Sequence, residues 1–468
     1  MSEGDLTLIG TLQRIVFSNP KNGFLIGSFQ EEKSKNSITI KGYLLGAKES
    51  QTLHLKGVWE NDPKYGKQFR VKEGMPVEPT NREGILSYLS SGDFPGIGPK
   101  TAERIFEKFG EKTYEIMDEE PEQLLKVKGF GKKQLKAVQE GREEQRGYRD
   151  VMTFLGSLGI TPAYKARIYA KYGMNCISMI KENPFDLTEI KGIAFIMADN
   201  IAMELGFDQN SSKRAVCALL YMLEQEAQNG HTCFPRKTLL DKTIDEMLRS
   251  RNGPIKTEVL ENSLKTLVEE KSIKSIHYDE TSEIHTEILA IPKFYYAEQR
   301  IVENFQRLTK SESFTKFDAE RDLIVSQENR LGIKLDSVQL EAIEAALQNK
   351  VLIITGGPGT GKTTLVRFIL GLMSRRIPSV ALAAPTGRAA KRLSETTSYQ
   401  ASTIHRLLEA DNMGFQRTRN QPLESELLIV DESSMIDTLL MDALLEAIPS
   451  SSRLVIVGDV DQLPSVGP

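Results

Sequence analysis

The sequence predicts a multidomain chain of α+β and α/β parts: a small β-barrel, a tandem repeat of helical hairpins, a helical winged-helix-like module and an α/β domain with a parallel sheet. Three observations predict this order. Short β-rich runs fill residues 6–75, an internal repeat covers residues 81–207, and strands alternate with helices from Leu335 onward. The expected domain ranges are 1–80, 81–207, 208–320 and 321–468.

The composition is that of a soluble globular protein. The 468 residues carry 60 basic and 64 acidic side chains, a net charge of −4, and 40% are apolar. This balance argues against charge-driven disorder and against binding to nucleic acid by bulk charge, so such contacts must come from local basic surfaces. Three cysteines without a CxxC pair exclude a disulfide scaffold and argue against structural zinc. We find neither a signal peptide nor an apolar span of about 18 residues, so we expect no membrane contact and a cytoplasmic location.

The first part reads as a barrel of the OB type. Its five runs are separated by turn signals such as Asn19-Pro20-Lys21-Asn22-Gly23. Small barrels of this kind often bind single strands, and an equally good interpretation is a structural or docking barrel. The only tryptophan, Trp59, has no aromatic cluster near it in the sequence that would form a stacking platform.

The second part repeats itself with an offset of 63 residues, and one register holds without a gap. Gly96 recurs as Gly159, Gly129 as Gly192 and Ile105 as Ile168. Each copy is expected to contain two helical units joined by tight glycine turns.

The turns of the first copy, Pro95–Lys100 and Lys128–Lys133, resemble the helix-hairpin-helix element of DNA-repair proteins. Glycine turns expose backbone N–H groups, and the helix that starts there favours a phosphate at its N-terminus. Five lysines and no acid lie between Lys126 and Lys136. Such a contact binds the DNA backbone without reading sequence. The candidate DNA-binding residues are Gly96, Gly98, Lys100, Gly129, Gly131, Lys132 and Lys133.

The second copy departs from this pattern, because Thr161 and Ala194 replace the second glycine of each hairpin. The substitutions favour a structural role there. A helical spacer that only packs is the alternative for both copies.

The third part is mostly helical, with apolar periodicity in Ala215–Ala227 and Val259–Val268. An extended pair follows, Ile273–Tyr278 and Ile284–Ile291, so the sequence predicts helices with a two-stranded wing. Many such modules only pack. The histidines here have no metal-ligand spacing.

The chemistry is expected in the last part. Buried-type strands are predicted at Val351–Thr355, Ser379–Ala384, Glu426–Asp431 and Arg453–Gly458. The first strand runs into a complete GxxxxGK[ST] loop, whose backbone cradles phosphates. In it, Lys362 reaches the β- and γ-phosphates and Thr363 binds Mg²⁺. The candidate ATP-binding residues are Gly356, Gly357, Pro358, Gly359, Thr360, Gly361, Lys362, Thr363 and Thr364.

An acidic pair ends the strand Glu426–Asp431. Asp431 is expected to hold Mg²⁺, and Glu432 to polarise the attacking water. Elsewhere such a pair can be only a solvated turn, but beside a phosphate loop the catalytic interpretation is favoured. Gln462, in the segment Gly458–Pro464, is expected to sense the γ-phosphate.

These motifs together resemble a superfamily 1 helicase, and most closely the RecD-like 5′-to-3′ DNA helicases with a RecA-like motor domain. Gln339 resembles the glutamine that reads adenine, and it precedes the phosphate loop as in the family. Ala384–Leu393 and Ser402–Arg406 resemble segments that grip single-stranded DNA, and Asp431-Glu432 and Gly458–Pro464 complete the series in family order. From these segments the resemblance implies DNA contacts by Pro385, Thr386, Arg388, Lys391, Arg392 and His405.

The resemblance implies ATP and Mg²⁺ as cofactors, and single-stranded DNA and 5′-tailed duplex as partners. It also implies a role in DNA repair or recombination, with Lys362, Glu432 and Gln462 as catalytic residues. Seven basic residues and no acid lie between Lys362 and Ser394, which supports DNA binding. Family helicases carry a second RecA-like domain with a catalytic arginine, and the sequence up to Pro468 encodes only the first, so we expect weak nucleotide binding without unwinding.

Two other functions remain open. The hairpins and barrel can form a DNA-binding module whose ATPase lobe is catalytically incomplete. A different P-loop enzyme, such as a loader or a kinase, is the other alternative, and Gln339 together with the segments around Arg388 and Asp459 argues against it.

Overall fold

The structure is a computed structural model that describes residues 6–19, 22–34, 36–79, 81–278, 286–311, 315–317, 321–411, 413–459, 465 and 467–468. The chain divides into two compact units, Met1–Arg214 and Ala215–Pro468, and each is described by itself. Among the described residues, no helix has both the length and the apolar character needed to span a membrane.

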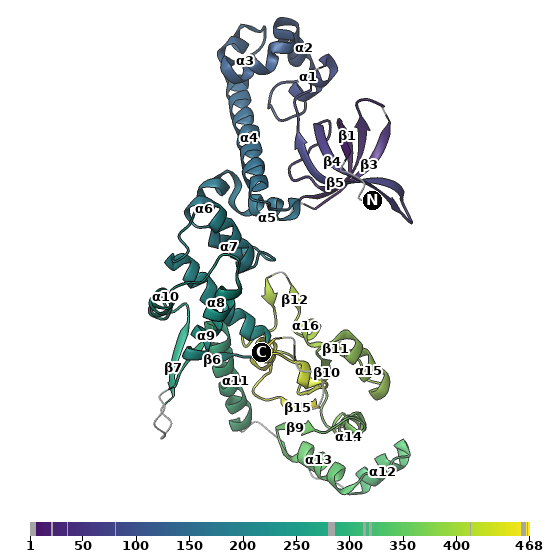
Figure 1. Ribbon diagram of the computed structural model, residues 1–468. Coiled ribbons are helices and arrows are strands. Elements are labelled where there is room, and N and C mark those ends of the chain that lie inside the picture. Colours follow the sequence, from purple (N-terminus) through teal and green to yellow (C-terminus); the bar gives the residue numbers. More distant parts are fainter. Residues whose placement is uncertain are drawn as a thin grey trace. The chain divides into compact units, whose positions relative to one another are not determined.

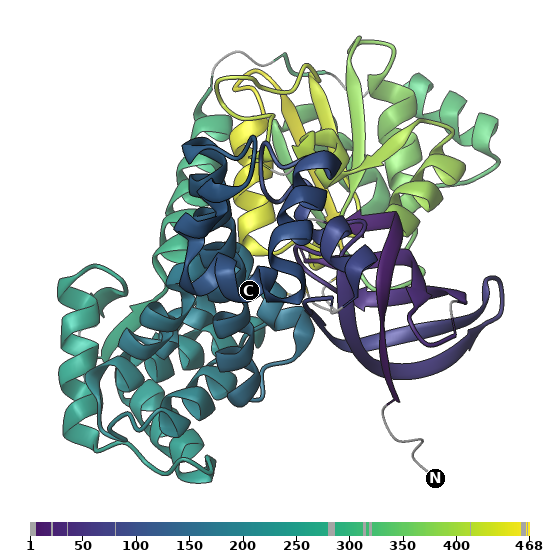
Figure 2. The same ribbon diagram turned by 90° about the horizontal axis from the view of Figure 1, so that it is seen from above.

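The predicted barrel is confirmed as a closed five-stranded barrel in the order β1-β2-β3-β5-β4 (Figures 1 and 2). Its strands are β1 (Leu6–Asn19), β2 (Phe24–Glu31), β3 (Ser37–Tyr43), β4 (Thr52–Asp62) and β5 (Gly66–Pro76). Alternate side chains fill the interior, among them Leu25, Ile40 and Phe69, all at most 1% exposed. Trp59 is partly buried and packs edge-on against Phe69 at the margin of this core, with the Lys67 ammonium group over its ring.

Helix α1 (Arg82–Leu89) leads into the tandem repeat, which the structure also confirms. The first copy contains α2 (Pro99–Phe109), η1 (Gly110–Lys112), α3 (Thr113–Glu119), η2 (Pro121–Lys126) and α4 (Lys132–Ser157). The second contains α5 (Pro162–Tyr172), η3 (Gly173–Asn175), α6 (Cys176–Glu182), η4 (Pro184–Glu189) and α7 (Phe195–Glu204). Every element of the second copy starts 63 residues after its counterpart. The turns keep their geometry too, since Gly129 and Gly192 have φ of +85° and +95°.

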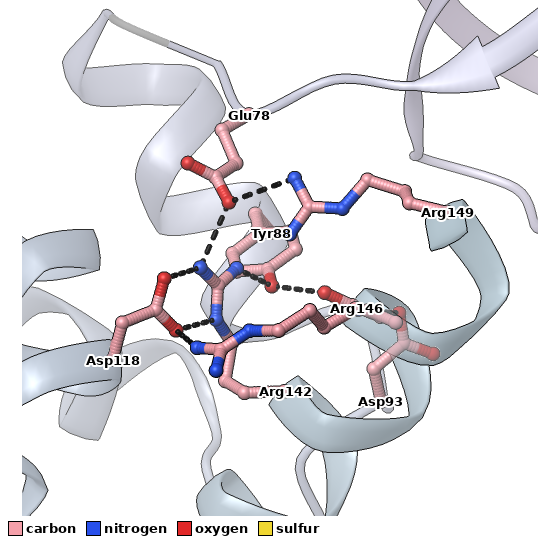
Figure 3. A network of polar contacts seen from close by, with 8 residues as sticks. Glu78, Tyr88, Asp93, Asp118, Arg142, Arg146 and Arg149 are labelled. Atoms are coloured by element: carbon pink, nitrogen blue, oxygen red, sulfur yellow. Dashed lines mark hydrogen bonds and ion pairs between the residues drawn. The ribbon is translucent and has the colours of Figure 1, made fainter. Parts of the chain in front are cut away.

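A buried arginine ties the first copy to the chain that leaves the barrel (Figure 3). Arg142, on α4, is 4% exposed and donates to Asp118 at 2.7 Å, to Tyr88 at 2.8 Å and to Glu78 at 2.8 Å. Burial acts against its charge, but these partners raise the pKa of Arg142 above its ordinary value. Burial also acts to raise the pKa of Asp118, and the bonds and charge of Arg142 outweigh it, so that pKa lies below its usual value.

The second unit begins with the helical module. Its elements are α8 (Ser212–Gln228), β6 (Cys233–Pro235), α9 (Arg236–Arg249), α10 (Thr257–Glu269), β7 (Lys274–Tyr278), β8 (Thr286–Ala290) and α11 (Pro292–Lys310). The predicted wing is present as β7 and β8, but its sheet has a third strand, in the order β6-β8-β7. β6 spans three residues, too few to show the alternation by which strands are found in a sequence.

The α/β domain follows. Its main elements are α12 (Arg321–Leu331), α13 (Ser337–Gln348), β9 (Val351–Thr355), α14 (Lys362–Met373), β10 (Val380–Ala384), α15 (Gly387–Thr397), β11 (Ala401–Thr403), α16 (Ile404–Leu407), β14 (Leu427–Val430), η5 (Ser433–Met435), α17 (Thr438–Ala447) and β15 (Arg453–Gly458). A short two-stranded sheet pairs β12 (Ala410–Asp411) with β13 (Gly414–Phe415). The main sheet is parallel throughout, in the order β11-β10-β14-β15-β9.

Helices cover both faces of this sheet (Figure 2). Leu427 and Ile429 point to the layer of α13 and α14, whereas Leu428 and Val430 point to the layer of α11 and α17. Because both faces are buried, the strands read as continuous apolar runs. The sequence missed β11, whose residues Ala401–Thr403 are half-buried and partly polar.

Replacing Arg142 with leucine should lower the free energy of unfolding of the first unit by about 3 kcal/mol, because Asp118 and Glu78 lose their buried partner. Arg146 provides the control. It lies 3.4 Å from the same Asp118 carboxylate, but its side chain is 57% exposed, so Arg146→Leu should cost less than about 1 kcal/mol. Urea unfolding followed by circular dichroism measures both, and equal losses would contradict the role of the buried arginine.

Candidate nucleotide site and DNA-binding surfaces

The phosphate loop lies between β9 and α14, where the carboxyl end of one strand meets the start of a helix. Gly359 and Gly361 have φ of +81° and +86°, values at which any side chain strains the backbone. Gly361 is the N-cap of α14, and Lys362 is the first residue of that helix. The glycines therefore allow the loop to wrap around an anion at a helix N-terminus.

The ammonium group of Lys362 is held by its own loop and by one acid. Its Nζ donates to the carbonyls of Gly356 at 2.5 Å and Gly357 at 2.7 Å, and to Asp459 Oδ2 at 3.2 Å. The Asp459 side chain is 1% exposed. An arriving phosphate would compete with these oxygens for the same donor.

Sequence reasoning gave no role to Asp459, although a signal was present. An acid directly after a buried strand that pairs with β9 must lie beside the phosphate loop. Gln462, the predicted γ-phosphate sensor of the same segment, lies outside the described residues.

Asp431 and Glu432 follow β14 at the same edge of the sheet. Burial raises the pKa of Asp431 above its ordinary value. Two weaker effects lower it: the Glu432 backbone N–H, which donates to Asp431 Oδ1 at 2.9 Å, and the positive charges of Lys362 and Arg392. Glu432 has φ of +55°, a strained conformation for a residue with a side chain. Such strain is concentrated at functional sites, which supports the proposed role of this turn.

Gln339 lies against the phosphate loop although it is 21 residues from Thr360 in the chain. It occupies the first turn of α13, where Asp336 caps the helix, and its Nε2 donates to the Thr360 carbonyl at 3.2 Å. The Thr360 hydroxyl in turn donates to the Gly357 carbonyl at 3.0 Å. The structure thus brings the candidate adenine reader to the loop that is expected to hold the phosphates.

The residues at this edge suit a nucleotide with Mg²⁺. Thr363 and Thr364, in the first turn of α14, are half-buried, and Pro358 is exposed in the loop. Within the described ranges, no group of three or more His, Cys, Asp or Glu side chains could hold a metal alone. The carboxylate of Asp431 and the hydroxyl of Thr363 are the oxygen donors that Mg²⁺ takes when phosphates and waters complete its shell.

A basic surface adjoins the site. Thr386 follows β10 and caps α15, accepting from the Ala389 backbone N–H at 3.2 Å. The cap fixes the start of a helix on which Arg388, Lys391 and Arg392 are exposed, and Pro385 precedes it. His405, on α16, is also exposed and packs its ring against Phe415 at 5.6 Å. The candidate DNA-binding residues of this domain therefore lie on loops and helices that follow β10 and β11.

The two turns of the first repeat form a second basic surface. Gly98 and Gly131 are the N-caps of α2 and α4, and Lys100, Lys132 and Lys133 are exposed beside them. Gln134 joins the turns, since its Nε2 donates to the Gly96 carbonyl at 2.7 Å and its Oε1 accepts from the Gly131 N–H at 2.6 Å. Both helix N-termini are thus held in one arrangement that is suited to two phosphates.

The second repeat keeps the scaffold of the first. Arg104 donates to the Lys128 carbonyl at 3.0 Å, and Arg167 makes the same bond to Lys191 at 2.8 Å. Thr161 and Ala194 take the N-cap positions of the two glycines. The arginine bond thus holds the turn in both copies, whatever residue occupies the N-cap.

Comparison with protein families gives four matches along the chain. Residues 5–79 match the OB-fold domain of the ATP-dependent DNA helicase YrrC, and residues 92–144 a SAM-like helix-hairpin-helix tandem. Residues 144–233 match the helix-hairpin-helix domain of the ATP-dependent RecD2 DNA helicase, and residues 339–468 match an AAA domain.

Individual relatives point to the same kind of protein as the family matches do. The chain is 29% identical over 448 residues to the ATP-dependent RecD2 DNA helicase of Deinococcus radiodurans, covering 93% of this chain and 61% of the relative. It is 41% identical over 152 residues to the RecBCD enzyme subunit RecD of Mycobacterium tuberculosis, covering 27% of this chain and 26% of that one. The Pif1 helicase from Candida albicans is 26% identical, with a TM-score of 0.24 over 28% of this chain and 34% of that chain, too low to carry over structural detail.

Loop, acidic pair and sheet define a P-loop nucleotide-binding domain, joined in one chain to an OB-type barrel and tandem helix-hairpin-helix modules. Along most of its length, the chain is similar to the RecD2/RecD-like helicase family. It spans about 61% of the length of the RecD2 relative.

The contact between Gln339 and the loop can be tested with two glycine variants. Alanine strains the backbone at both Gly359 and Gly361, but only at Gly361 does the added methyl group meet Gln339, with Nε2 at 2.8 Å. Both variants should weaken nucleotide binding, and only Gly361→Ala should also reduce the preference for ATP over GTP, by about 5- to 10-fold. Titration with fluorescent ATP and GTP analogues measures the ratio. An unchanged ratio in Gly361→Ala would separate Gln339 from base recognition.

Proposed function

We propose that this chain forms the DNA-binding and nucleotide-binding part of an ATP-dependent 5′-to-3′ DNA helicase that acts in DNA repair or recombination. One observation carries the proposal. The phosphate loop, the acidic pair, Asp459 and the start of α15 all follow strands of one parallel sheet and meet at its carboxyl edge. The compartment that this proposal implies is the cytoplasm.

Each residue at the edge has a task in ATP hydrolysis. Bound ATP with Mg²⁺ would supply the phosphoanhydride whose cleavage drives movement. Lys362 would leave Asp459 to bind phosphate oxygens, and Thr363 and Asp431 would hold the metal. Glu432 takes a proton from the attacking water, and Gln339 binds the base. Glu432 comes shortly after strand β14, which is buried, so the sheet fixes the position of Glu432.

The DNA-binding part of the proposal depends on the neighbouring helix. Arg388, Lys391 and Arg392 lie on α15, directly after the strand that pairs with the Asp431 strand. Arg392 is close enough to Asp431 for its charge to act on the pKa of that carboxyl. A shift of α15 on nucleotide binding would therefore move the strand-gripping side chains, which is how we propose that hydrolysis is coupled to translocation along single-stranded DNA.

Direction, substrate and pathway are inferred from the family. The RecD2 relative is named an ATP-dependent DNA helicase, and the RecD relative a subunit of the RecBCD enzyme. We propose single-stranded DNA and 5′-tailed duplex as the substrates of this chain by analogy with the RecD-like type.

Phosphate release from ATP, with and without single-stranded DNA, tests the function. DNA should stimulate release. Lys362→Ala should abolish both nucleotide binding and turnover, because it removes the loop's ammonium group, which is expected to bind the β- and γ-phosphates. Glu432→Gln should retain ATP binding and slow hydrolysis by about 10²- to 10⁴-fold, since it keeps the shape of the side chain and removes the base.

Two outcomes would decide against the proposal. A phosphorylated small molecule as product would make the chain a kinase. ATP and DNA binding without any DNA-stimulated turnover would leave the second candidate, a DNA-binding module with a nucleotide-binding lobe, which the bonds from Lys362 to its own loop also permit.

The salt dependence of single-strand binding tests α15. Each phosphate contact on a single strand contributes about 0.7 to the slope of log affinity against log salt concentration. Arg388→Ala and Arg392→Ala should each lower this slope by about that amount. Arg375→Ala is the control, because this exposed arginine follows α14 at the end away from the phosphate loop. Equal effects of Arg375→Ala and Arg392→Ala in fluorescence anisotropy would show that binding is unspecific surface attraction.

A further inference from the structure

A second candidate binding site lies in the first unit, on the outer wall of the barrel. A groove of about 680 Å³ runs along strands β3, β4 and β5, and the start of α5 forms its other side. Its size falls within the ~300–1,000 Å³ typical of ligand sites. The motor motifs take no part in it, because every lining residue belongs to residues 24–163.

Aromatic rings form one end of this groove. Phe24 on β2 and Tyr43 on β3 are directly opposite each other, with ring centroids 5.5 Å apart and planes at 70°. Both of these rings are half-buried. Phe17 lies beyond the lining of the groove, 6.4 Å from Phe24, and is 50% exposed. Three rings from three segments of the chain thus form the cluster that the sequence around Trp59 does not show.

Most of the remaining residues that line the groove are charged. Lys41, Lys56, Arg70 and Lys72 face the groove together with two acids, Glu60 and Glu73, so the lining has an excess of positive charge. Lys41 and Arg70 both form ion pairs with Glu60, and Arg70 Nε lies 3.3 Å from Glu60 Oε2. These pairs fix the positions of both cations on the wall. Lys56, Arg70 and Lys72 are all exposed and can meet a polyanion from solvent.

The α5 side adds a favourable electrostatic field. Thr161, Pro162 and Ala163 line the groove, and Thr161 caps the 11-residue α5 without a side-chain hydrogen bond. The positive end of the helix dipole therefore faces the same space as the lysines. In the first repeat the position equivalent to Thr161 is Gly98, and a lysine, Lys100, follows it two residues later.

We propose that this groove binds unpaired bases and backbone of single-stranded DNA. A cationic track beside partly exposed rings is the chemistry by which proteins hold single strands, with bases stacked on rings and phosphates near the cations. Duplex DNA does not suit the site, because paired bases offer no open face for stacking. The choice of DNA over RNA rests on the proposed helicase function.

Photo-crosslinking tests the site directly. The full chain, without nucleotide, is irradiated with a single-stranded oligonucleotide that carries 5-iododeoxyuridine, and the crosslinked peptides are identified by mass spectrometry. We expect crosslinks to peptides that contain Phe17, Phe24 or Tyr43. Crosslinks confined to the second unit or to the hairpin turns would overturn the proposal.

Variants separate binding from folding. Tyr43→Leu removes a ring while keeping apolar bulk, and should lower the barrel crosslink yield about 5- to 100-fold, the range for loss of one stacked base. Lys72→Glu should lower it as well. Lys33→Glu makes the same charge change on an exposed lysine beyond the far end of the β2–β3 pair from Phe24 and Tyr43, and should not. An equal drop with Lys33→Glu would overturn the proposal.

Two further readouts keep the result clear. Emission from Trp59, which packs against the barrel core, reports whether each variant is folded. DNA-stimulated phosphate release does not require the groove. If the unmodified chain shows no such release, the helicase function is contradicted, but the crosslinking result still stands. Preferential crosslinking to RNA of the same sequence would overturn the choice of DNA.

Discussion

Everything in the nucleotide site depends on one constraint, that the strands of the α/β sheet are parallel. Since each strand ends at the same edge, the segments after β9, β10, β14 and β15 must meet there, however far apart they lie in the chain. The bond between Lys362 and Asp459 spans 97 residues and exists only because β9 and β15 are neighbours. Burial on both faces makes the edge rigid, so each loop begins from a fixed point.

The first unit depends on a different constraint, a repeated turn. Its glycines adopt positive φ at equivalent positions, and an arginine of the first helix of each copy, α2 or α5, binds the turn carbonyl. The copies differ where α4 continues to Ser157, whereas α7 ends at Glu204. The longer helix carries Arg142, whose bonds to Glu78 and Asp118 link the barrel exit to the first copy. The repeat thus determines the fold of both copies, and the extra length of α4 in the first copy provides the arginine that connects this copy to the barrel exit.

Local patterns predicted most of this fold. The β-rich runs in residues 6–75 predicted the barrel, and the repeat with its offset of 63 residues predicted the hairpins. The GxxxxGK[ST] loop and the apolar runs around it predicted the parallel sheet. Interactions between distant segments were beyond such reasoning. The cluster of Phe17, Phe24 and Tyr43 depends on barrel register, and the Arg142 network depends on packing of α4 against the barrel exit. The assignment of individual site residues remains a prediction.

The surfaces proposed to bind DNA differ in chemistry, and this difference bears on the proposed helicase function. The hairpin turns offer backbone N–H groups and lysines, which bind phosphates of paired or unpaired DNA alike. The barrel groove offers rings, which need an unpaired base. Because one chain carries both, a strand held by either surface is at high local concentration for the other and for α15, so weak individual contacts can give tight overall binding. Fully paired DNA would satisfy the hairpin turns alone, whereas DNA with an unpaired stretch would satisfy both chemistries, so discrimination against fully paired DNA needs no sequence reading.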